Sequence, residues 1–196
     1  MSLDHPPRIA PLAPPYDPEV AAALAKWMPP GSPMEPLKLF RTLYQNPHLS
    51  SRMRPLGAGI LGRESALDPR EREILIDRTC ARCGCEYEWG VHVAVYGKAV
   101  GLDRVQLENT ASETVDPTLW SEREQHLLTL VDELHETATL SDTTWEQVAA
   151  TWSIAQILEM VIIVGWYHLI SFVANAAHIE QEAWAAHFPK TAKESV

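Results

Sequence analysis

The segment from Ser153 to about Ala177 constrains the fold most, because it is long and apolar on every side. Ser153 and Gln156 form a capping box, which predicts that a helix begins at Ser153. Residues 160–167 carry no polar side chain. A helix that is apolar all round lies in the core of a soluble protein or is shared with a partner subunit. We therefore expect a long central helix that has both roles.

A membrane span is the alternative interpretation of this segment. A span needs about 20 predominantly apolar residues, and four polar residues interrupt this one, namely Gln156, Glu159, His168 and Asn175. The net charge of −10 also argues against anionic membranes and nucleic acid as partners, because either would require a basic patch. We therefore expect a protein that binds neither.

Helix signals recur along the chain, and no stretch shows the sustained alternation that is typical of strands. Asp68 and Pro69 predict a helix start, and this helix is expected to end at Gly84. The next helix should begin near Cys85 and run to about Val100, with glycines that let another backbone approach. Further helices are expected over 36–45, 48–61, 121–134, 141–152 and 181–187. The predicted fold class is all-α, a single-domain bundle of roughly eight helices.

The N-terminal part of the chain differs in composition from the rest. Ten of the fifteen prolines lie in residues 1–36, which predicts an extended arm with a short helix near 18–28 and a helical domain over 37–196. The N-terminus lacks the apolar core of a signal peptide. All three cysteines (Cys80, Cys83 and Cys85) lie close together instead of stapling distant segments. We therefore expect a reducing compartment, the cytoplasm.

The candidate catalytic residues follow the pattern Glu73-x11-Cys85-x2-Glu88-x3-His92. At about 100° per residue, Cys85, Glu88 and His92 fall within about 60° of one another on a helix. This helix face continues as Val95, Tyr96 and Ala99, so it points inward. Titratable groups that point into an apolar interior have shifted pKa values and are candidates for chemistry.

Each of these residues has an expected role and a plainer alternative. Unpaired N–H groups at a helix start favour a thiolate at Cys85, although a buried and inert thiol is the alternative. A buried Glu88–His92 pair must be hydrogen-bonded, so its proton is available for transfer, whereas a surface pair would be ordinary. If the two helices pack antiparallel, Glu73 comes alongside His92 and can orient its ring or hold a water molecule.

Other motifs carry less chemistry. Gly57, Gly59 and Gly62 match a dinucleotide-binding pattern but lack the preceding strand, so we expect a flexible turn there. Cys80 and Cys83 could be a redox pair, half of a zinc site, or two buried cysteines. A metal site at Glu73, Glu88 and His92 is a weaker alternative. His168, Ser171 and Asn175 share one face of their helix. They predict a polar seam, that is, a line of hydrogen-bonded polar side chains at a helix or subunit contact. We expect no cofactor and no metal.

The pattern from Glu73 to His92 resembles the active-site signature of the carboxymuconolactone decarboxylase and alkylhydroperoxidase D superfamily. The flanking residues are similar too, including Glu86-Tyr87-Glu88-Trp89, the Gly101-Leu102 turn and the later apolar helix. The resemblance covers roughly residues 37–177. It implies an all-helical fold that assembles into trimers or hexamers.

In the thiol-active members, two cysteines occupy the positions of Cys85 and Glu88, and residues 73 and 92 relay protons to them. The resemblance therefore implies an antioxidant, peroxiredoxin-type activity that reduces hydroperoxides or a partner's disulfide, with a thioredoxin-like or lipoyl reductant. Here Glu88 replaces the second cysteine. Cys80 or Cys83 would then be the resolving thiol, and Cys80 is favoured because a Cys83–Cys85 bridge would be strained.

Two other functions stay open. The decarboxylase members use no cofactor and act on a carboxylated lactone, and for that chemistry Glu88 and His92, with Glu73 behind them, are the natural set. The protein would then be a lyase or isomerase on a small molecule. The third possibility is a non-enzymatic oligomeric scaffold, which predicts that packed apolar side chains fill the space around His92.

Overall fold

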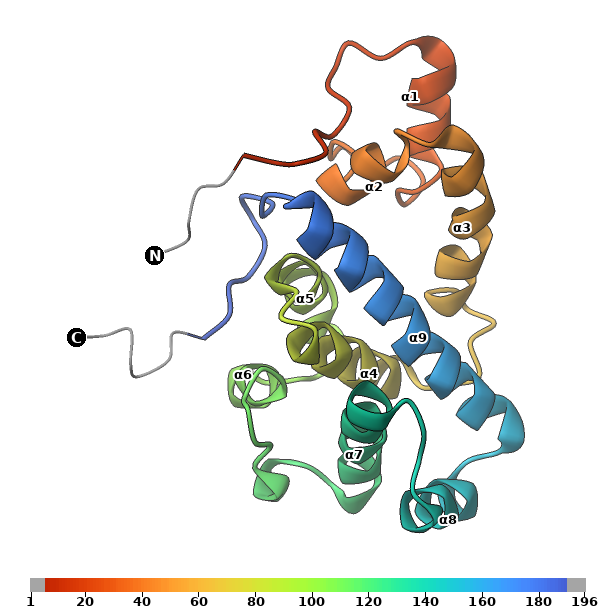
Figure 1. Cartoon of the computed structure of the whole chain (residues 1–196), viewed down its shortest axis with the longest axis vertical. Helices are drawn as coiled ribbons and strands as arrows, with labels where there is room; N and C mark the ends of the chain where they lie inside the picture. The colour runs from red at the N-terminus through yellow and green to blue at the C-terminus, as the bar shows by residue number, and fades with distance from the viewer. Residues whose placement is uncertain (1–5, 190–196) are drawn as a thin grey trace, which may run out of the picture.

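The structure is a computed structural model that describes residues 6–189. Within these residues it contains nine α-helices, one π-helical segment, one 3-10 turn and no strand, which confirms the all-α prediction (Figure 1). The helices are α1 (Pro18–Ala25), α2 (Lys38–Leu43), α3 (Pro47–Ile60), α4 (Pro69–Arg82), α5 (Glu86–His92), α6 (Arg104–Thr110), α7 (Glu122–Thr137), α8 (Asp142–Thr151) and α9 (Ile154–Ala177). The π-helical segment η1 is Val93–Gly97, and the 3-10 turn η2 is Pro117–Leu119.

The long helix α9 runs through the molecule and packs against α4 (Figure 1). The predicted capping box is formed, because the Ser153 side chain accepts from the Gln156 amide. Met160 and Ile163 are fully buried, whereas Leu158 and Phe172 on another side of the helix are 60% and 63% exposed. By length and composition, α9 is the one described helix that could cross a membrane. Its buried side makes it a core helix of this bundle.

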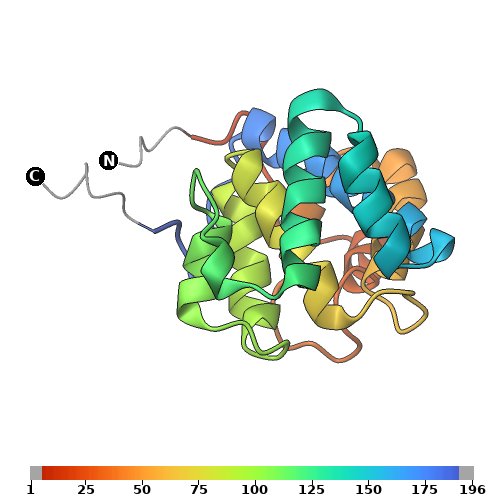
Figure 2. The ribbon, with the colours of Figure 1, turned by 90° about the horizontal axis from the view of Figure 1, so that it is seen from below.

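Seen from below, α7 and α8 lie side by side across one face of the bundle (Figure 2). Capping boxes begin both α7, at Ser121 and Glu124, and α6, at Asp103 and Gln106. The helix α6 is absent from the sequence-based expectation, although its capping box is visible in the sequence. Its seven residues offer too few positions for a convincing apolar stripe.

The predicted helix from Cys85 to about Val100 is interrupted. It consists of α5 followed by the π-helical segment η1. Before it, Gly84 adopts a φ of +60°, which reverses the chain so that α5 packs back along α4. The prediction of a close backbone approach is confirmed at Gly90, where an added Cβ would lie 2.0 Å from the Ala186 carbonyl oxygen. The reversal at Gly84 explains how distant positions of α4 and α5 meet.

The predicted helix at 181–187 is wrong, because this segment is irregular. Its polar groups bond to other elements: Gln181 donates to the Glu86 carbonyl and Glu182 accepts from the Lys38 amide. The Ala186 amide donates to the Gly90 carbonyl at 3.0 Å. These tertiary hydrogen bonds outweigh the weak local helix preference of a short segment.

The turn predicted over Gly57, Gly59 and Gly62 begins later than expected, because Gly57 and Gly59 lie inside α3 and only Gly62 lies in the turn that follows it. An added Cβ on Gly57 would lie 3.0 Å from the Trp166 ring, so this glycine allows α3 and α9 to approach.

The proline-rich arm packs on its own domain. The Arg8 amide donates to the Ala177 carbonyl at 2.8 Å, and the Trp27 ring stacks on Phe40 at 4.7 Å.

Candidate active site

The buried pair of Glu73 and His92 is the centre of the site. The Nδ1 of His92 lies 2.7 Å from the Glu73 Oε2, and both residues are buried. Glu73 comes from α4 and His92 from the end of α5, so the packing of these two helices brings them together. The prediction that Glu73 comes alongside His92 is confirmed. Arg72 adds a longer contact, with its Nε 3.5 Å from the Glu73 Oε1.

The other ring nitrogen of His92 faces two oxygen atoms. The Tyr167 hydroxyl lies 3.1 Å from the Nε2, and the Glu88 Oε1 lies 3.7 Å from it. Tyr167 comes from α9, and its ring also meets the imidazole edge-on at 5.1 Å. Sequence reasoning missed Tyr167, because it sits in an apolar run that is typical of a core helix.

The carboxylates decide the charge of His92. Burial alone would lower its pKa, but Glu73 and then Glu88 outweigh that effect and raise the pKa to about 10. The ring is therefore an imidazolium at neutral pH, and both of its N–H groups are donors. Glu73 accepts one of these hydrogen bonds, and the Tyr167 oxygen is placed to accept the other. Burial and the nearby carboxylates raise the pKa of Tyr167 well above its usual value, so it remains a phenol.

One carboxylate oxygen of Glu88 is unpaired. Its Oε2 is buried and has no hydrogen-bond partner among the described residues. Because an unpaired buried oxygen is costly, such an atom marks a place for a substrate group or a water molecule. The predicted Glu88–His92 pair therefore exists, at a separation that is longer than a normal hydrogen bond.

Asp77, one helical turn after Glu73 on α4, was not predicted as part of this site. Its carboxyl group is buried, and neither oxygen has a partner among residues 6–189. Burial and the nearby Glu73 charge raise the pKa of Asp77 well above its usual value. This shift favours the neutral carboxyl form of Asp77 beside the Glu73–His92 pair.

A pocket of about 220 Å³ opens onto this site. Glu88, His92 and Tyr167 line it together with mainly apolar and aromatic side chains. The aromatic residues are Trp27, Phe40, Tyr96, Trp166 and Trp184. Lys26 and Arg54 also line the pocket and supply positive charge. An apolar cavity with a few converging polar groups is typical of a small-molecule site.

Cys85 is not among the described residues that line the pocket. It is fully buried next to Cys80, whose carbonyl accepts from the Cys85 amide at 2.9 Å. Among the described residues that line the pocket, no cysteine is present. Burial raises the pKa of Cys85 to about 12, although the Glu88 amide opposes this effect. The expected thiolate at the helix start is therefore wrong for this structure, because desolvation outweighs the amide dipoles.

Burial raises the pKa of Cys80 and Cys83 as well, and all three cysteines are free thiols. Cys80 is fully buried, whereas Cys83 is half-buried at the end of α4. The structure thus places the three cysteines around the end of α4 and the start of α5, and none of them is among the described residues that line the pocket.

The sequence comparison agrees with the motif. Residues 47–133 match the profile of the carboxymuconolactone decarboxylase family, and this segment contains Glu73, Cys85, Glu88 and His92. This segment of the chain is therefore similar to the carboxymuconolactone decarboxylase family, and the fold of the chain is similar to that of an alkylhydroperoxidase D-like protein. A search of curated protein sequences finds no match.

Solved structures extend the similarity of the fold to nearly the whole chain. A peroxidase-related protein from Silicibacter sp. TM1040 has a TM-score of 0.77 and 15% identity, covering 96% of this chain and 100% of its own. A protein of unknown function from Agrobacterium tumefaciens, linked by its description to AhpD antioxidant defence, has a TM-score of 0.65 and 18% identity over 72% and 95% of the chains. A variant of the debrominase Bmp8 in complex with 2,3,4-tribromopyrrole has a TM-score of 0.72 and 15% identity over 89% and 91%.

Proposed function

We propose that the protein is a cofactor-independent lyase or isomerase that moves protons on a small substrate with a carboxylate or lactone carbonyl. The observation that carries this proposal is the composition of the pocket. Glu88, His92 and Tyr167 open into it, whereas none of its described lining residues is a cysteine. The apolar walls fit the body of such a substrate, and Lys26 and Arg54 fit its carboxylate.

Each polar group has a defined task in this proposal. Glu73 holds the His92 imidazolium, which donates through Nε2 to the Tyr167 oxygen. The Tyr167 hydroxyl is then free to donate its own proton to a substrate carbonyl oxygen, where negative charge develops. The unpaired Oε2 of Glu88 accepts the proton from the neighbouring carbon. Proton uptake by Glu88 and hydrogen bonding by Tyr167 therefore act on adjacent substrate atoms.

A thiol peroxidase is the second candidate, and a specific observation favours it. Glu88 adjoins both Cys85 and His92, so it could pass a proton between the thiol and the imidazole. Cys85 would attack the hydroperoxide oxygen and form a sulfenic acid with release of the alcohol. Cys80 would then condense with the sulfenic acid to form a disulfide with release of water, and a thioredoxin-like or lipoyl dithiol would reduce that disulfide. The raised pKa of Cys85 and its place outside the pocket count against this order of events.

The Cys85→Ser variant separates these two functions. We expect it to retain turnover of small carboxylated lactones to within about threefold, because no cysteine is among the described residues that line the pocket. Assays over a panel of such lactones would measure this. Wild-type protein treated with stoichiometric cumene hydroperoxide should keep Cys85 as a free thiol in mass spectrometry. Peroxide consumption by the wild type that Cys85→Ser abolishes would instead establish the thiol mechanism.

The scaffold alternative requires a filled pocket around His92. The pocket of about 220 Å³ beside this residue does not meet that requirement and supports an enzyme.

We also propose that the protein works in the cytoplasm, where three free thiols remain reduced.

We propose that a second copy of the chain covers the exposed side of α9, within a trimer or hexamer. Leu158, Ile162, Leu169 and Phe172 are all exposed large apolar residues on this helix. Gly165 lies among them, and an added Cβ there would meet no atom within 4 Å, so close helix packing is open at this point. A contiguous apolar face of this kind marks a protein interface.

Phe172→Glu is expected to convert the assembly to monomers, because a carboxylate in an apolar interface would be desolvated without a partner. Light scattering coupled to size-exclusion chromatography measures the mass. Val105→Glu, on the equally exposed side of α6, is the matched control and should leave the mass unchanged. A wild-type protein that is already monomeric at micromolar concentration would contradict the proposal.

A further inference from the structure

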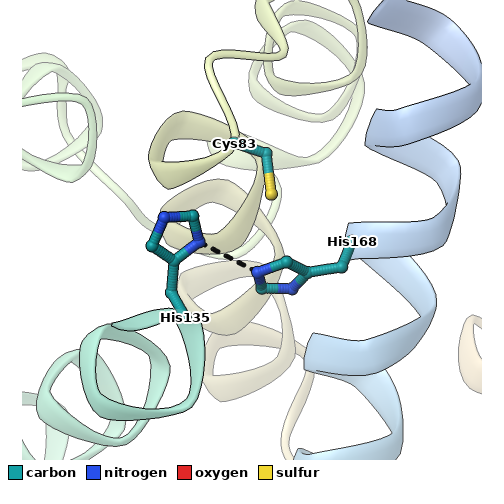
Figure 3. A group of neighbouring side chains, drawn as sticks. All are labelled: Cys83, His135 and His168. Atoms are coloured by element: carbon teal, nitrogen blue, oxygen red, sulfur yellow. Dashed lines mark hydrogen bonds between the residues drawn. The ribbon is translucent and has the colours of Figure 1, made fainter. Parts of the chain in front are cut away.

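A second cluster of reactive side chains lies apart from the pocket, at Cys83, His135 and His168 (Figure 3). One possible ligand atom of each residue lies within 4.8 Å of the others. Cys83 caps the end of α4, His135 lies in the last turn of α7, and His168 lies in the middle of α9. All three residues are half-buried, so an ion from solvent can reach them. Three packed helices therefore fix the cluster.

The hydrogen bonds already orient one histidine as a ligand. The Nδ1 of His168 lies 2.8 Å from the Val164 carbonyl oxygen, so this nitrogen carries the proton. The Nε2 of His168 is then left with its lone pair, and it lies 2.9 Å from the His135 Nδ1. A backbone carbonyl that fixes the tautomer of a histidine is a common outer contact of metal sites.

The position of Cys83 is fixed as well. Asn175 donates from its side-chain nitrogen to the Cys83 carbonyl at 2.9 Å. The predicted polar seam of His168, Ser171 and Asn175 therefore exists, and it faces the end of α4. His135, from a different helix, completes the cluster and was not predicted, because its neighbours on α7 give no sign of what α9 places opposite it.

We propose that Cys83, His135 and His168 bind a zinc ion. One thiolate and two imidazoles form a borderline-soft ligand set that suits Zn²⁺, at about 2.3 Å for sulfur and about 2.0–2.1 Å for nitrogen. In a tetrahedral site these bond lengths place two nitrogens about 3.3 Å apart. The two imidazoles, now 2.9 Å apart, need to separate only slightly. Water takes the fourth position, since the cluster is open to solvent.

Binding of zinc rearranges the protons. In the free protein the His135 Nδ1–H donates to the His168 Nε2, so His135 must change to the tautomer that carries its proton on Nε2. The Cys83 thiol loses its proton to solvent, and the site releases about one proton per ion. A zinc-bound Cys83 is unavailable as a resolving thiol for Cys85. The ion also ties the ends of α4 and α7 to α9.

The test uses untagged, chelator-treated full-length protein and two probes, Zn²⁺ by calorimetry and Co²⁺ by absorption. We expect one ion per chain, a thiolate-to-cobalt charge-transfer band, and a zinc-dependent rise in Tm of about 5–10 °C at 100 times Kd. Cys83→Ser should remove the band, and His135→Gln or His168→Gln should weaken zinc binding at least about tenfold.

Two variants outside the cluster are the controls. Cys80→Ala removes a neighbouring thiol and His48→Gln removes an exposed histidine, so both should keep the band and the wild-type affinity. Circular dichroism of each variant verifies that it is folded. Absence of one-to-one binding by the folded wild type would overturn the proposal. A thiolate-to-cobalt charge-transfer band that persists in Cys83→Ser would also overturn it.

Discussion

His92→Gln is expected to lower kcat on the proposed lactone substrate by about 10²–10³-fold, the range that the loss of one preorganised electrostatic donor costs. Glutamine is similar in size and can still accept from or donate to Tyr167, but it carries no charge. The loss should appear in kcat rather than in KM, because His92 acts on the charge that develops in the transition state. Steady-state kinetics on the best lactone of the panel measures it.

The pH profile provides an independent readout. Because the pKa of His92 is about 10, the wild type should keep its imidazolium at neutral pH and lose activity as the pH rises through that region. His48→Gln, at an exposed position, should have the profile of the wild type. An alkaline limb near the ordinary histidine pKa, or His92→Gln with full activity, would contradict the assigned role.

The contact between Glu73 and His92 could be predicted from the sequence for clear physical reasons. Asp68 and Pro69 mark one helix start and Gly84 marks a reversal, so α4 and α5 had to run back along one another. Given that arrangement, the spacing of eighteen intervening residues brings the carboxylate to the imidazole. Local signals were sufficient here because the turn between the helices is short.

The rest of the site depends on packing that local signals do not encode. Tyr167 and Asp77 belong to apolar or buried stretches, and only the contacts of α4, α5 and α9 show that they surround His92. Cys85 is buried, as its inward helix face predicts, but it is not among the described residues that line the pocket. The helical wheel predicted that Cys85 points inward and could not show where the cavity lies.

The change to π-helix directly after His92 limits prediction in the same way. An ideal α-helix would continue the inward face through Val95, Tyr96 and Ala99, but the π-helical turn of η1 shifts the register there. Tyr96 still lines the pocket, whereas Ala99 is exposed. A single irregular turn thus changes the direction of every side chain after it, which periodicity cannot reveal.

Glu73→Ala is expected to lower the free energy of unfolding by about 3–5 kcal/mol near pH 6, because it leaves the buried His92 imidazolium without its closest partner. Arg72, with its Nε 3.5 Å from Glu73, loses a partner as well. Urea unfolding of wild type and variant measures the difference. Glu64→Gln, on an exposed loop, is the matched control and should change stability by less than about 0.5 kcal/mol.

The effect of Glu73→Ala should depend on pH, with a sign that follows from the pKa of His92. In the folded wild type this pKa is raised from 6.5 to about 10, so the folded state binds more protons than the unfolded state between these values. The stabilisation is fully present below about pH 6.5 and is lost as the pH rises through about 10, by at most about 1.4 kcal/mol per pH unit. The difference in the free energy of unfolding between the wild type and Glu73→Ala should therefore become smaller from pH 6 to pH 9.5.

The double variant Glu73→Ala/His92→Gln distinguishes a charge effect from a packing effect. If the loss comes from an unpaired charge, the double variant should be more stable than Glu73→Ala, because the second substitution removes that charge. If the loss comes from a cavity, the double variant gains nothing from the second substitution and the gap stays constant with pH. A pH-independent gap would show that Glu73 fills space beside His92 and does not set its charge, and the proposed imidazolium would have to be abandoned.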